Sequence, residues 1–335
     1  MNCNMLLRTK NMKRRKLTLP FLFGTMLTSI VLLAASCEGS EMPDSPADGK
    51  EVPLRISSLA LTGEATVSRA ATSVDIATGK NVGFFVKAES GKYAAQNNLK
   101  GVYSNTATLK AWVPSPDSIW LNNQDATVMV YYPYAAGQTS STLTLTPKLY
   151  PATGDDGDLS YARFTANNRY LVTDPKKIDL TLNPVYARLV VTVIKDADYP
   201  TEVKIGKITV SGGNICSSAN LDMTTGGYSR STGAVTTTFT EKTVGLAGSA
   251  SPASIDLLLI PNDLSSDDVS LTLEPDGKKT TAVIARAKFG NKLEAGKQYT
   301  VTVKLKPGTL TPGVSDVTIE DWTAGSSISS DTEFD

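Results

Sequence analysis

The sequence predicts an all-β protein, and three observations lead to that prediction. Several segments alternate apolar and polar residues with a period of two, and in "VTVKLK" this places Val301, Val303 and Leu305 on one face. Turn-forming residues such as Pro275-Asp276-Gly277 separate these segments. Amphipathic helical patterns of ten or more residues are missing. Many short strands with frequent turns indicate β-sandwiches.

The first 36 residues predict an export signal. The basic cluster Lys13-Arg14-Arg15-Lys16 precedes an apolar run over residues 17–35, and small residues then lead to Cys37. A retained membrane helix is the alternative, but no positive cluster follows the run to hold it in a bilayer. Small residues before a cysteine resemble a bacterial lipobox, although Ala34 stands where lipoboxes usually carry Leu. The resemblance implies that residues 1–36 are a lipoprotein signal peptide and that Cys37 is lipidated.

An acidic stretch follows the predicted lipidation site. Residues 37–50 contain Glu38, Glu41, Asp44 and Asp48, and we expect them to form a flexible linker. The stretch also resembles the tag that sends lipoproteins of Bacteroidetes to the cell surface. The tag interpretation places the mature chain at the cell surface, whereas a plain linker does not bear on location.

Composition narrows the function of the mature chain. Residues 1–36 hold six Lys and Arg and no Asp or Glu, so the remainder has 27 basic against 33 acidic residues, a balance of −6. Such a balance does not favour nucleic-acid binding. The chain has no histidine, which excludes Ser-His-Asp and Cys-His catalysis and makes most zinc sites improbable. We therefore expect neither an enzyme nor a cofactor.

Two breaks predict where the mature chain divides. Asp174-Pro175-Lys176-Lys177 interrupts the strand pattern, and Asn183-Pro184 follows shortly after. We expect an N-terminal β-sandwich domain over residues 51–181 and a C-terminal β-sandwich domain over residues 182–335. Within the second domain, Cys216 is the one mature cysteine besides Cys37, and we expect it to be a small buried residue.

At this point the order of segments resembles a known family. These segments are "VPLRISSLAL", "SRAAT", "VGFFVKA", "IDLTLNPVYARLVVTV", "LEAGKQYTVTVKL" and "VTIEDWTAG". The chain resembles the fimbrillin-like (Mfa-like, type V) pilin lipoproteins of Bacteroidales. The resemblance implies two transthyretin-like β-sandwiches in tandem and a structural subunit at the outer membrane. It also implies head-to-tail assembly with other pilin subunits, identical or different, into surface fimbriae that serve adhesion.

The same resemblance implies assembly by strand exchange after cleavage by an Arg-specific protease. Arg69 lies among small and polar residues in "ATVSRAAT" and is the expected cleavage site. Arg55 is the competing arginine, but it lies inside the strand pattern of residues 52–56. Loss of the first strand exposes unpaired backbone groups and an apolar groove, which a strand from another subunit can fill. A head-to-tail contact of this kind propagates as a filament.

Two sets of residues are candidates for the strands that are exchanged. The groove-filling strand of the uncut chain is expected to use Leu54, Ile56, Leu59 and Leu61. The donor strand is expected near the C-terminus, and its candidate residues are Val317, Ile319, Trp322, Ile328 and Phe334. An ordinary closing strand with a frayed tail is the alternative for this second set.

Two other groups of residues leave alternatives open. Asp155, Asp156 and Asp158 could bind calcium, although their glycine-rich setting favours a plain turn. A set of aromatic residues could form a sugar-binding platform, which would suit a surface glycan-binding lipoprotein, or could be core and cross-strand residues. The set comprises Trp112, Trp120, Tyr131, Tyr132 and Tyr134.

Overall fold

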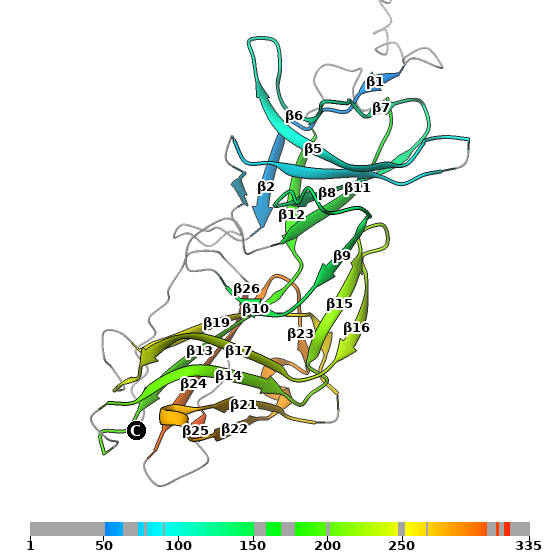
Figure 1. Cartoon of the computed structure of the whole chain (residues 1–335). Helices are drawn as coiled ribbons and strands as arrows, with labels where there is room; N and C mark the ends of the chain where they lie inside the picture. The colour runs from blue at the N-terminus through cyan, green and yellow to red at the C-terminus, as the bar shows by residue number, and fades with distance from the viewer. Residues whose placement is uncertain are drawn as a thin grey trace, which may run out of the picture. The chain divides into compact units, whose positions relative to one another are not determined.

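The computed structural model confirms the all-β prediction (Figure 1). It describes residues 51–62, 73–76, 79–89, 91–150, 159–168, 178–198, 202–246, 252–265, 267–306, 313–314 and 318–321. In this part of the chain the only helices are two short 3₁₀ turns, η1 (Pro275–Gly277) and η2 (Arg286–Phe289). None of the described residues forms a helix that is long and apolar enough to cross a membrane.

The first half of the described chain builds one eight-stranded sheet in the order β3-β2-β12-β11-β8-β4-β5-β6, and a separate pair β1-β7. The strands are β1 (Val52–Pro53), β2 (Ser58–Thr62), β3 (Ser73–Asp75), β4 (Val82–Val86), β5 (Gln96–Asn105), β6 (Lys110–Ser115), β7 (Trp120–Leu121), β8 (Ala126–Tyr132), β11 (Ser160–Ala166) and β12 (Asp179–Pro184). Val82, Phe84, Val128 and Val130 lie in its hydrophobic core.

The second half contains two larger sheets that share one core. A seven-stranded sheet has the order β10-β19-β13-β24-β25, with β18 paired to β13 and β26 paired to β24, and a four-stranded sheet has the order β17-β14-β21-β22. The strands are β10 (Lys148–Leu149), β13 (Ala187–Lys195), β14 (Lys204–Ser211), β17 (Val235–Thr243), β18 (Gly245–Leu246), β19 (Ala253–Leu259), β21 (Val269–Leu273), β22 (Thr280–Ile284), β24 (Lys297–Leu305), β25 (Gly313–Val314) and β26 (Thr318–Asp321).

The alternation predicted for residues 301–305 is confirmed in this core. Val301, Val303 and Leu305 are all buried, and they belong to the same cluster as Ile208 of β14 and Leu271 of β21. The cluster therefore joins side chains from both sheets, which is how a β-sandwich is held together.

Two smaller sheets complete the second half. The three-stranded sheet has the order β16-β15-β9, and the two-stranded sheet pairs β20 with β23. The strands are β9 (Thr142–Leu145), β15 (Cys216–Asp222), β16 (Gly227–Thr232), β20 (Asn262–Asp263) and β23 (Lys292–Leu293). Cys216 is buried as predicted, and burial raises the pKa of its thiol.

The segment that contains β9 and β10 connects the two halves. Strands β9 and β10 come before residue 181, yet β9 pairs with β15 and β10 pairs with β19. Leu143 and Leu145 of β9 lie in a third hydrophobic cluster together with Met129 of β8 and Leu221 of β15. The strand pairing thus crosses the boundary predicted between residues 181 and 182, and that boundary stays a prediction.

Candidate subunit-assembly site

The predicted groove-filling residues lie in a continuous N-terminal segment, residues 52–62. Leu54, Ile56 and Leu59 are at most 1% exposed, while Leu61 is half-buried and packs against the same core. Arg55 points to the other face and is exposed, as the alternation predicts. The segment therefore contributes core side chains to the first half of the molecule.

The first part of this segment is hydrogen-bonded at one end of the eight-stranded sheet. The backbone N–H of Leu54 donates to the carbonyl oxygen of Ile119 at 2.7 Å. Ile56 and Trp112 of β6 exchange two backbone hydrogen bonds, at 3.0 and 2.7 Å. Strand β1 pairs antiparallel with β7, with Pro53 opposite Trp120.

The second part of the segment changes partner. The backbone N–H of Ser57 donates to the carbonyl oxygen of Ile178 at 2.8 Å, and β2 then runs parallel to β12 (Figure 1). The Ser58 hydroxyl also donates to a carboxylate oxygen of Asp179 at 2.5 Å. Since β6 ends the sheet at one side and β12 lies near the other, residues 52–62 join strands that are distant in the sheet order.

Burial indicates how strongly this segment is held. A fully buried Leu or Ile side chain contributes about 1.5–3 kcal/mol, so the three deeply buried side chains together contribute about 5–9 kcal/mol. Loss of the segment would remove this contribution and would leave the backbone groups of Trp112 and Ile119 without their present partners. The segment will not leave readily unless another strand replaces it.

The expected cleavage site lies outside the described residues, as do residues 1–36, the linker and Cys37. Arg69 falls between β2 and β3, and these two strands pair antiparallel, with Thr62 opposite Ser73. A cut after Arg69 would therefore separate β2 from β3 in the chain. It would leave β3 on the side that is retained.

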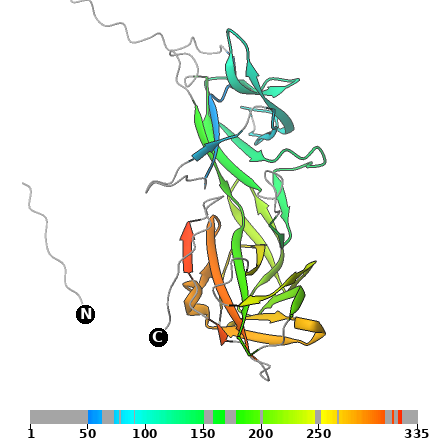
Figure 2. The same ribbon diagram turned by 90° about the vertical axis from the view of Figure 1, so that its left-hand side faces the viewer.

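The candidate donor region is described only in part. Ile319 lies in β26, which pairs antiparallel with β24 (Figure 2). In this register Ile319 is opposite Tyr299. Val317, Trp322, Ile328 and Phe334 lie outside the described residues. The backbone of β26 is therefore bound to the chain's own second half.

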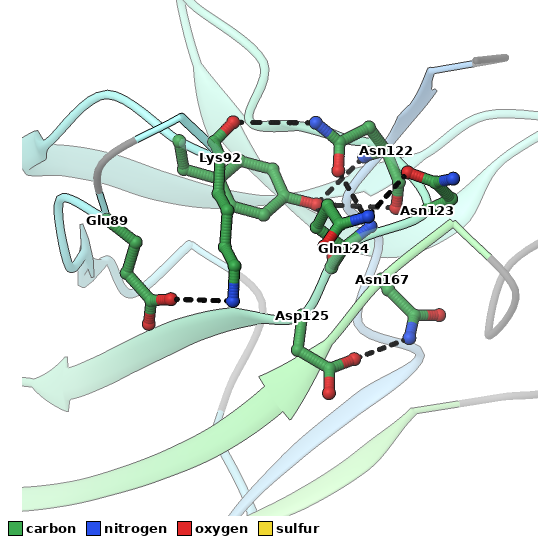
Figure 3. Close-up of polar contacts among 8 residues, drawn as sticks. Glu89, Lys92, Asn122, Asn123, Gln124, Asp125 and Asn167 are labelled. Carbon is green, nitrogen blue, oxygen red and sulfur yellow. Dashed lines mark hydrogen bonds and ion pairs between the residues drawn. The ribbon is translucent and has the colours of Figure 1, made fainter. Parts of the chain in front are cut away.

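A polar network that the sequence did not reveal supports the loop after β7 (Figure 3). The Tyr93 hydroxyl accepts a hydrogen bond from the backbone N–H of Asn122 at 2.9 Å and donates to the carbonyl oxygen of Gln124 at 2.7 Å. The Asn167 amide donates to the Asp125 carboxylate at 2.6 Å. Burial raises the pKa of the Tyr93 hydroxyl. The network holds the end of β7, which is the partner of β1.

The aromatic residues considered as a sugar platform do not share one surface. Trp112, Tyr131 and Tyr132 are at most 3% exposed, whereas Trp120 is 53% exposed. Trp112 packs edge-on against Tyr103, with 5.6 Å between the ring centres. Asp155, Asp156 and Asp158 lie outside the described residues, and within those residues no group of three or more His, Cys, Asp or Glu could hold a metal ion.

Comparison with known proteins decides the family. A profile of fimbrillin-like proteins matches residues 68–322. The chain belongs to the fimbrillin-like family. This family supports a role as a fimbrial subunit in a cell-surface appendage and association with other fimbrial subunits. A search of curated protein sequences found no match.

One solved structure agrees with the fold. A proposed cell adhesion protein from Bacteroides uniformis is 18% identical, with a TM-score of 0.51, and the match covers 80% of this chain and 99% of the other. The tip fimbrial protein Mfa3 from Porphyromonas gingivalis, with a C-terminal truncation, is 11% identical, with a TM-score of 0.43. That match covers 80% of this fimbrillin-like chain and 100% of the other.

Proposed function

We propose that this chain is a structural pilin subunit that is exported as a lipoprotein through Cys37 and assembled into surface fimbriae by donor-strand exchange. An Arg-specific protease cuts after Arg69, and residues 37–69 then leave the first half. The assembled fimbria serves adhesion. The observation that carries this proposal is the position of residues 52–62, which fill the core of the first half and lead directly into the segment with Arg69.

The spacing of apolar residues supports a particular donor. The three deeply buried side chains are at positions 54, 56 and 59, a spacing of i, i+2 and i+5. Val317, Ile319 and Trp322 have the same spacing, and no other set of large apolar residues between 307 and 335 has it. Because alternate side-chain pockets determine which strand fits a groove, residues 317–322 of a second subunit are the proposed replacement.

The experiment compares two arginine variants of the full chain. Arg69→Ala should yield a folded, lipidated protein that does not assemble, because residues 52–62 stay covalently joined to β3. Arg55→Ala is the matched control: it removes an exposed arginine from the same segment and should still assemble. Filaments are scored by electron microscopy and by SDS-resistant ladders.

The N-terminus of the assembled subunit provides a second measurement. Sequencing of surface material should find Ala70 as the first residue. Filaments built from Arg69→Ala chains would show that assembly does not depend on this cut.

A further inference from the structure

A pocket of about 250 Å³ opens beside β9, where the chain passes from the first half to the second. The rings of Tyr131 and Tyr186 and the side chains of Leu143 and Leu159 form its apolar wall. Pockets for drug-sized ligands measure about 300–1,000 Å³, so this one suits a ligand of one or two residues.

The polar groups of this wall are already engaged within the protein. The Tyr131 hydroxyl donates to the Asn98 side-chain oxygen at 2.6 Å, and the Tyr186 hydroxyl donates to the carbonyl oxygen of Thr146 at 3.2 Å. The Gln138 amide donates to two backbone carbonyl oxygens, at 2.8 and 2.6 Å. The pocket is therefore held in shape by its own hydrogen bonds, and such preorganisation favours binding.

Lys148 gives the pocket a positive charge. Its ammonium lies 5.8 Å from the centre of the Tyr186 ring, and among the described residues no carboxylate forms an ion pair with it. An apolar, aromatic wall beside a cation fits an aromatic group that is joined to a carboxylate.

The segment that follows β26 has this chemistry. Phe334 stands between Glu333 and Asp335, so an aromatic residue adjoins two side-chain carboxylates in the sequence. Residues 322–335 contain three acidic residues and no Lys or Arg. The 13 residues from Trp322 to Phe334 can span at most about 45 Å when fully extended.

We propose that the pocket beside β9 binds Phe334-Asp335 of this fimbrillin-like chain. The aromatic ring enters between Tyr131 and Tyr186, and the side-chain carboxylate of Asp335 faces Lys148. Docking of these residues would fix the tail beyond the donor residues 317–322. The inference goes beyond the proposed strand exchange and does not depend on it, because the pocket contains no residue before Arg69.

Photo-crosslinking in the full chain tests the inference. Phe334→p-benzoylphenylalanine places a reactive aromatic group at the proposed position, and mass spectrometry identifies the residues that it labels. We expect labelling of Leu143 and Leu159, within one chain or between two chains. Lys148→Glu should lower this labelling about fivefold, because a weak attraction becomes a repulsion. Adding Asp335→Lys to Lys148→Glu should restore it.

Two further variants keep the test decisive. Lys110→Glu reverses an exposed charge on β6 and should leave the labelling unchanged. Thr146→Trp fills the pocket from an exposed position and should abolish the labelling even where Lys148→Glu fails to fold. Labelling that falls mainly outside the pocket, or that is insensitive to both pocket variants, overturns the inference.

The same crosslink in the Arg69→Ala chain separates this inference from the proposed function. Labelling that persists without filaments supports binding of Phe334-Asp335 in the pocket. Strand exchange is then tested only by the assembly experiments. In the natural chain, filaments without pocket labelling would be consistent with the proposed function and would overturn the role of Phe334-Asp335.

Discussion

The N-terminal segment 52–62 and the C-terminal strand β26 are held in different ways. The N-terminal segment buries three aliphatic side chains and is hydrogen-bonded to both β6 and β12. Among the described residues, strand β26 pairs with one strand, β24, through four residue pairs. This difference is consistent with the proposal that the first segment leaves only after a covalent cut and a replacement, whereas β26 detaches when a short ladder opens.

The largest expected effect concerns the core contribution of the N-terminal segment. Ile56→Ala removes a side chain that is 0% exposed and should destabilise the uncut protein by about 2–5 kcal/mol, because it leaves a cavity in the core. Arg55→Ala, at the exposed neighbouring position, should change the free energy of unfolding by less than about 0.5 kcal/mol. Urea unfolding measures both. Equal and small effects would mean that the segment is not part of the core in solution.

An intermediate effect concerns how stability depends on pH through β24, the strand that pairs with β26. Burial raises the pKa of Tyr299, which lies opposite Ile319. A raised pKa in the folded state means that the stabilisation is fully present below the usual value of about 10 and is lost as the pH rises through the raised value. Above about pH 10 the unfolded chain loses this proton first, so the free energy of unfolding should fall by about 1.4 kcal/mol per pH unit for each tyrosine of this kind.

Tyr299→Phe provides the control for this pH dependence. The variant loses the acceptor for the Glu294 backbone N–H, at 2.9 Å, and should be less stable at neutral pH. Its disadvantage relative to the natural chain should shrink between about pH 10 and pH 12, because only the natural chain has a proton to lose at this position. A constant difference across this range would show that Tyr299 titrates with an unshifted pKa.

The sequence predicted which side chains face inward better than it predicted which strands pair with each other. Period-two alternation identified the buried face of residues 301–305 and the opposite orientations of Leu54 and Arg55, because alternation is a local property of an extended chain. It could not show that Ile56 pairs with Trp112 while Ser58 pairs with Asp179, since those choices depend on residues far apart in the sequence.

Two features of the site had no local signal. The crossing of β9 and β10 into the second half depends on pairing with β15 and β19, which follow more than 70 residues later. The network around Tyr93 depends on a single tyrosine hydroxyl that meets a loop 29 residues away. Neither a period nor a motif marks such contacts, because each is made only when distant strands come together.

The smallest effect on stability is expected at β26, and it sharpens the comparison most. Ile319→Pro removes a backbone donor in a strand that pairs with β24 alone among the described residues, and it should lower the free energy of unfolding by about 1 kcal/mol. The same substitution should block assembly, because a donor strand must form a ladder with hydrogen-bond partners in the groove of the next subunit. Ile319→Val keeps both the N–H group and a β-branched side chain, so it should preserve folding and filaments. Urea unfolding measures the role of β26 in stability, and electron microscopy of the two variants measures its role in assembly. If the Ile319→Pro protein still forms filaments, the donated strand lies elsewhere. The spacing that residues 54, 56 and 59 share with residues 317, 319 and 322 would then have no part in assembly.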